Sequence, residues 1–168
     1  NYFQENNLFT TKQFGFIKGR STTLQLLKLL DKWTKYLESG GQIDVVYTDF
    51  EKAFDKVPHR RLISKLKNYG INIELVTWIE NFLTRRKQQV RINGKFSNWK
   101  SVLSGIPQGT VLGPLLFIIF INDLPDLCEK ADIYLFADDA KLFKHINQKE
   151  DSLDLQNGCN YLYEWTMK

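Results

Sequence analysis

The sequence predicts an α+β domain in which antiparallel strands carry helices on one face. Short runs of alternating apolar residues end in turn residues, whereas longer segments repeat apolar residues at helical spacing. The chain of 168 residues, 43% hydrophobic and 14% aromatic, is also large enough to bury one sizeable core. Strands of this kind backed by helices define the α+β class.

Four helices are expected, over residues 22–39, 58–69, 74–84 and 113–125. Ser21 or Thr22 can cap the first, which stops at Gly40-Gly41, and Pro58 fits the first turn of the second. The first helix has an apolar stripe that we expect to face the core, formed by Leu24, Leu27, Leu30, Trp33 and Leu37.

Strands are expected on both sides of these helices. Residues 43–48 alternate as a strand does, and residues 133–135 and 142–143 flank a tight turn. Asn93-Gly94 lies between two further runs, 89–92 and 95–99, and this dipeptide is a strong two-residue hairpin signal.

Three carboxylates lie at the ends of these strands. Asp138 and Asp139 occupy the tight turn, and Asp49 follows the strand 43–48. Mg²⁺ prefers oxygen ligands, and paired ions stabilise the attacking and leaving oxygens of a phosphoryl displacement. The alternative is that the paired acids are ordinary turn residues and Asp49 caps the next helix.

Three motifs in order carry a resemblance to a known family. They are D-F-E-K-A-F-D-K-V-P-H at 49–59, S-G-I-P-Q-G-T-V-L-G-P-L-L-F at 104–117 and F-A-D-D at 136–139. In order and spacing they resemble motifs A, B and C of reverse transcriptases, above all those of non-LTR, LINE-like and jockey-like retrotransposons. Residues 13–22 resemble the segment that such enzymes place before a helix leading towards motif A.

The resemblance implies a polymerase palm, an antiparallel sheet backed by helices, with part of the fingers and with the thumb absent. Residues 1–168 are then expected to be one partial domain, with a fingers-side segment and helix over 1–42 and the palm over 43–168. The basic segment of the fingers and the motif D lysine are expected to fall outside these residues, so that the chain is a fragment.

The resemblance also implies a metal site. Asp49 and Asp138 match the acids that hold two Mg²⁺ ions, for which Mn²⁺ could substitute, and Asp139 matches a third, less directly coordinating acid. The backbone carbonyl of Phe50 is an expected further ligand.

The nucleotide site is implied in the same way. Phe54 matches the aromatic residue beneath the nucleotide sugar, with a core aromatic as the alternative. Gln108 matches a contact to the incoming nucleotide, and Gly109 leaves room for that approach. We expect His59, beside Pro58, to be a hydrogen-bonded structural residue.

Basic residues form two clusters in a chain of net charge +4. Nucleic-acid contact is predicted for Lys18, Arg20, Arg85, Arg86 and Lys87, because such side chains neutralise phosphates without reading sequence. The alternative is a solvated basic face.

The expected activity is RNA-directed DNA polymerisation, with an RNA template, a DNA primer and deoxynucleoside triphosphates as partners. The alternative is an inactive or domesticated fragment that acts as a binding module, and a metal-dependent nuclease is a weaker one. The longest apolar run, 115–121, is too short to span a bilayer. An intracellular protein is expected, for which the resemblance implies the nucleus and/or cytoplasm, and Cys128 and Cys159 are expected to stay reduced.

Overall fold

The structure is a computed structural model that describes residues 2–167. The chain forms two compact units, and each is described by itself. Unit 1 comprises Asn1–Glu51 and Ile121–Lys168, and unit 2 comprises Lys52–Phe120.

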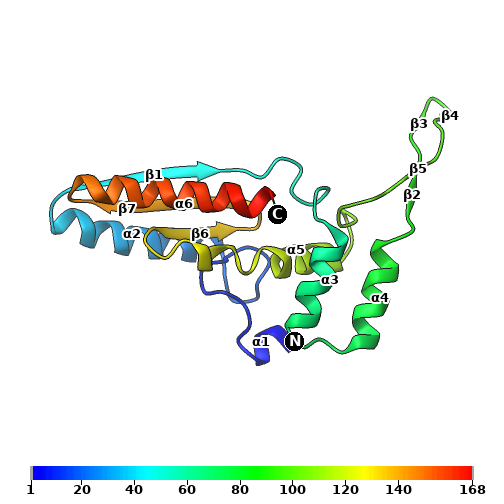
Figure 1. The fold of residues 1–168 in the computed structure, drawn as a ribbon, viewed down its shortest axis with the longest axis horizontal. Helices are drawn as coiled ribbons and strands as arrows, with labels where there is room; N and C mark the ends of the chain where they lie inside the picture. The colour runs from blue at the N-terminus through cyan, green and yellow to red at the C-terminus, as the bar shows by residue number, and fades with distance from the viewer. Residues whose placement is uncertain (1, 168) are drawn as a thin grey trace. The chain divides into compact units, whose positions relative to one another are not determined.

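Unit 1 contains a three-stranded antiparallel sheet in the order β1-β7-β6 (Figure 1). Its strands are β1 (Gln42–Thr48), β6 (Asp132–Phe136) and β7 (Asp139–Ile146). The predicted strand and hairpin are confirmed. The register pairs Thr48 with Ala140 and Phe136 with Asp139, so the end of β1 lies beside the β6–β7 turn.

Helices cover both faces of this sheet. Successive residues of a strand point to opposite faces, and on β7 Phe143 packs against Trp33 of α2 (Thr22–Glu38), whereas Leu142 contacts Gly158 of α6 (Lys149–Met167). The α+β class is confirmed, but the expectation of helices on one face is wrong for this unit. Two short elements complete it, α1 (Tyr2–Glu5) and the 3-10 helix η1 (Leu124–Leu127).

The predicted core stripe of α2 is confirmed at Trp33, which packs on the core, and is wrong for Leu24, Leu27, Leu30 and Leu37. Its leucines are exposed, and the residues that turn inward are Gln25, Leu29 and the half-buried Trp33. Residues 24–30 are apolar at five of seven positions, so two overlapping stripes satisfy helical spacing. The packing of Leu29 and Trp33 with Phe143 selects the i, i+4 stripe.

Unit 2 contains the helices α3 (His59–Asn68), α4 (Ile73–Leu83) and most of α5 (Leu112–Ile121). Two short ladders pair β2 (Lys87–Gln88) with β5 (Lys100–Ser101), and β3 (Arg91–Ile92) with β4 (Lys95–Phe96). The predicted hairpin is confirmed, with Asn93 and Gly94 both at positive φ, as the twist of a two-residue hairpin requires.

Within residues 2–167, none of the helices combines the length and the apolar character needed to cross a bilayer.

Candidate active site

The β6–β7 turn places two carboxylates at the tip of a hairpin. Phe136 pairs with Asp139, so Ala137 and Asp138 alone form the loop. Asp138 is half-buried and Asp139 is exposed. The hairpin and its adjacent acids are as predicted.

Asp49 reaches the same end of the sheet because β1 runs antiparallel to β7. It follows Thr48, and Asp139 precedes Ala140, the partner of Thr48. Asp49 and Asp139 both line a hollow of about 400 Å³ in unit 1. Its other lining residues are Thr22, Gln25, Tyr47, Thr48, Tyr134, Phe136, Ala140 and Lys141.

The donor chemistry of this end of the sheet fits a hard cation. Within residues 2–167, no ion pair engages Asp49, Asp138 or Asp139. The same residues contain no group of three or more acidic, His or Cys side chains already gathered as a metal cage. Mg²⁺ does not need one, since it usually keeps several waters and takes one or two carboxylates.

Phe50 lies directly after Asp49 and is half-buried. Its ring packs near that of Trp165 on α6, with centroids 6.2 Å apart, which anchors the chain just beyond Asp49. The role of its carbonyl as a ligand stays a prediction.

Motifs A and B lie against one another within unit 2. The amide of Ile106 donates to the carbonyl of Phe54 at 2.8 Å, and the side chain of Gln108 donates to Asp55 at 3.4 Å. The ring of Phe54 stacks on Phe117 of α5 with centroids 4.5 Å apart. The two predicted nucleotide-contacting side chains therefore belong to neighbouring segments, and the roles of Phe54, Gln108 and Gly109 stay predictions.

Gly105 is the point at which these segments meet. Its φ is +88°, and a Cβ there would lie 2.6 Å from the carbonyl oxygen of Asp55. Its carbonyl oxygen lies 2.8 Å from Nε2 of His59 and accepts from Arg86 at 2.6 Å. The structural role expected for His59 is confirmed.

Two of the five predicted nucleic-acid contacts have internal roles that the sequence did not indicate. Arg86 also donates to the carbonyl of Leu83 at 2.7 Å, and Arg20 donates to the carbonyl of Gln13 at 2.6 Å. Burial lowers the pKa of both guanidinium groups. Lys18, Arg85 and Lys87 are exposed, and a nucleic-acid contact stays a prediction for all five.

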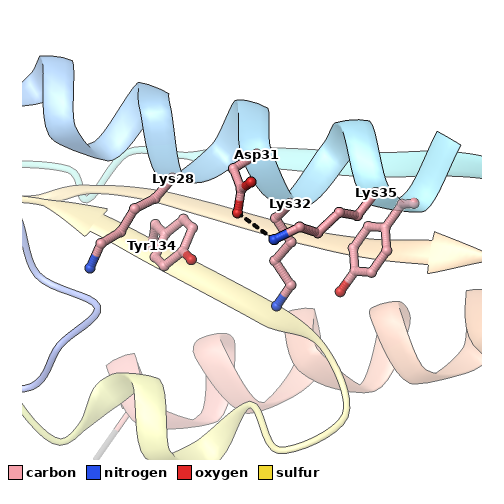
Figure 2. Close-up of a pocket in the computed structure, with 6 residues that line it drawn as sticks. Lys28, Asp31, Lys32, Lys35 and Tyr134 are labelled. Atoms are coloured by element: carbon pink, nitrogen blue, oxygen red, sulfur yellow. Dashed lines mark hydrogen bonds and ion pairs between the residues drawn. The ribbon is translucent and has the colours of Figure 1, made fainter. Parts of the chain in front are cut away.

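Sequence reasoning missed a second hollow in unit 1, of about 440 Å³, along α2 (Figure 2). Lys28, Lys32 and Lys35 line this hollow. They are four and three residues apart, a spacing that places them on one face of a helix and that could have indicated the cluster from the sequence. Lys35 pairs with Asp31 at 2.8 Å, and Lys32 pairs with Asp132. Burial alone would lower the pKa of Lys32, but the hydrogen bond and charge of Asp132 raise it.

The antiparallel sheet, with acidic residues at one end, can be compared with the folds of known proteins. The chain resembles apo telomerase from Candida tropicalis truncated from its C-terminal domain, with a TM-score of 0.65 and 12% identity over 92% of this chain and 34% of that one. At this identity the likeness shows the fold, which is that of a palm-type polymerase.

The chain belongs to the reverse transcriptase family. The family described as "Reverse transcriptase (RNA-dependent DNA polymerase)" matches residues 1–168. A probable RNA-directed DNA polymerase from transposon BS of Drosophila melanogaster is 34% identical over 96% of this chain, and the enzyme from mobile element jockey of Drosophila funebris is 34% identical over 93%. The chain spans 18% of the length of each.

Proposed function

We propose that this chain is the polymerising part of a non-LTR retrotransposon reverse transcriptase, which extends a DNA primer along an RNA template. The main support is that Asp49 and Asp139 line one hollow at the end of the sheet. The chain also belongs to the reverse transcriptase family. In the reaction the 3′-hydroxyl of the primer attacks the α-phosphorus of a deoxynucleoside triphosphate. A new P–O bond forms, the α–β bridge breaks, pyrophosphate leaves and the hydroxyl loses its proton.

Asp49, Asp138 and Asp139 would hold divalent cations, two Mg²⁺ ions in the full reaction. Bound there, the ions would neutralise the charge that develops on the attacking and leaving oxygens. The sheet positions these carboxylates, because the end of β1 and the β6–β7 turn lie side by side at one end of it. Positioning and electrostatic stabilisation are the main demands of phosphoryl transfer.

The motif A and motif B segments of unit 2, which contact one another, would bind the incoming nucleotide. Gln108 is exposed, and Gly109 has a φ of +76° with open space where a side chain would begin. A ring at Phe54 under the sugar would exclude a 2′-hydroxyl. Base selection would come from pairing with the template. The protein would act in the nucleus and/or cytoplasm.

The test is primer extension by the protein at its full natural length. An RNA template with an annealed DNA primer should be copied with Mg²⁺ and deoxynucleotides, and chelation of the metal or Asp49→Asn should abolish extension. A protein that binds the duplex but never extends it would instead be the non-catalytic binding module, which neither the intact acids nor the family match favours.

A further inference from the structure

Gln13 carries a buried carboxamide to which the sequence assigns no role. The residue is only 1% exposed. Its Nε2 donates to the carbonyl of Ala137 at 3.1 Å, and its Oε1 accepts from the amide of Ala137 at 2.9 Å and from that of Gly15 at 2.7 Å. One side chain therefore satisfies both backbone polar groups of a residue 124 positions away.

Ala137 is the turn residue that immediately precedes Asp138. Its φ is +55°, in the left-handed region that is sterically unfavourable for a non-glycine residue. Such conformations persist only where the surrounding structure over-determines them. The two-residue loop imposes part of this conformation, and the carboxamide of Gln13 holds both backbone polar groups of Ala137 in it.

The segment around Gln13 is itself fixed to the sheet. It forms a parallel bridge to β6, in which the amide of Phe14 donates to the carbonyl of Leu135 at 2.8 Å and the amide of Leu135 donates to that of Lys12 at 2.9 Å. The carboxamide is therefore held against the same strand that leads into the turn.

Gly15 lets this segment come close to the turn. A Cβ at this position would lie 2.4 Å from the backbone nitrogen of Ala137, a separation that side chains do not tolerate. Arg20 secures the other side of the segment through the carbonyl of Gln13. The turn is thus clamped by residues that belong to none of the three motifs.

We infer that Gln13 is a positioning residue for the metal-binding carboxylates, an inference that rests on the proposed function. By fixing both backbone groups of Ala137, it sets the direction in which the chain enters Asp138 and Asp139. Of these two acids, Asp139 lines the same hollow as Asp49 at the end of β1. Groups hydrogen-bonded to metal ligands typically change metal affinity about 10–100-fold when removed, and we expect an effect in that range from a clamp on the residue before Asp138.

The test compares two buried carboxamides of unit 1 in the protein at its full natural length. Gln13→Met removes the clamp and keeps the length of the side chain. The control is Asn122→Leu, because Asn122 also bridges backbone groups, the amide of Thr10 at 2.9 Å and the carbonyl of Leu8 at 2.8 Å, and both of these groups lie outside the β6–β7 turn. Both substitutions should lower the melting temperature.

Mn²⁺ affinity, followed by the EPR signal of the free ion, should separate the two variants. Gln13→Met should weaken Mn²⁺ binding about tenfold or more, whereas Asn122→Leu should leave it near that of the parent. If Gln13→Met does not fold, Gln13→Asn, with the same amide on a shorter side chain, is measured instead. Equal Mn²⁺ affinities in parent and Gln13 variant would overturn the inference.

A second substitution distinguishes positioning from loss of packing. Glycine adopts positive φ without the steric penalty of alanine, so Ala137→Gly in the Gln13→Met background should recover part of the Mn²⁺ affinity. Absence of any recovery would mean that Gln13 acts only through general stability.

Primer extension separates this inference from the proposed function. A parent protein that never extends a primer overturns the proposed function, while its Mn²⁺ affinities still decide the role of Gln13. In an active parent, Gln13→Met should lower kcat and leave the KM for the template–primer unchanged. A raised KM with kcat unchanged would count against positioning.

Discussion

The aromatic ring of Phe54 either only packs in the core or also contacts the nucleotide sugar. One face stacks on Phe117, and the side chain is only half-buried. If the other face supports the nucleotide sugar, Phe54→Val should admit ribonucleotides while the acids still hold metal. Rejection by steric clash is differential transition-state binding, and each ~1.4 kcal/mol relieved is tenfold in rate. Single-nucleotide extension with matched deoxyribonucleotide and ribonucleotide measures the ratio.

The control is Phe117→Val, which removes the same stacking pair from the other side. It should lower stability and leave sugar discrimination unchanged, since the ring of Phe117 is 2% exposed. A collapse of discrimination in both variants would show that the packing of the pair matters, and not a direct contact with the sugar.

Cys128 is a buried thiol whose reactivity should be low. Burial, with a smaller contribution from Cys159, raises its pKa from 9.0 to about 11. Because the thiolate is the reactive form, its thiolate fraction at pH 8 should be about 100-fold below that of a thiol with a pKa of 9.0. Iodoacetamide labelling read by mass spectrometry should modify Cys159 well before Cys128, and equal rates would mean that Cys128 is open to solvent.

The segment between α4 and β2 carries basic side chains in two different environments. Arg85 and Lys87 are exposed there, whereas Arg86 holds two backbone carbonyls. Neutralising Arg85 and Lys87 to Gln should weaken template–primer binding for all sequences and reduce the slope of log K against log salt by about 1 for each lost phosphate contact. Fluorescence anisotropy across a salt series measures the slope.

A matched pair on α3 serves as the control for that segment. Arg60 and Lys67 are exposed and lie in the same unit. Their replacement by Gln should leave the salt slope close to that of the parent. Identical slopes for the parent and for the Arg85 and Lys87 variant would identify this segment as a solvated face.

Metal binding at the carboxylate site should raise the thermal stability of the whole molecule. A ligand that binds only the folded state stabilises it by RT ln(1 + [L]/Kd), about 2.7 kcal/mol at a hundred times Kd. Mg²⁺ or Mn²⁺ should therefore raise the melting temperature in differential scanning calorimetry, and Asp138→Asn should largely remove that rise. The control Asp44→Asn changes an acid at the other end of β1 and should retain it; an undiminished rise in Asp138→Asn would refute the assignment.

Local chemistry explains which parts of the fold could be predicted from the sequence. Asn93-Gly94 and the run ending at Asp139 specify hairpins through turn geometry and alternation, interactions that span a few residues. Helices α3 and α4 overlap the expected segments 58–69 and 74–84, and they bury apolar residues at helical spacing, among them Leu62, Leu66 and Val76. Order and spacing of motifs A, B and C were likewise sufficient to identify the family, which the match over residues 1–168 confirms.

Long-range contacts decided the rest. The inward face of α2 depends on Phe143, and the internal role of Arg86 depends on the carbonyl of Gly105. The clamp of Gln13 on Ala137 joins residues 124 positions apart. The family, the hairpin and its acids could be predicted from the chain, because they depend on residues close together in sequence. The buried polar side chains that hold the hairpin could not, because a buried side chain must find a hydrogen-bond partner and that partner comes close only in the folded protein.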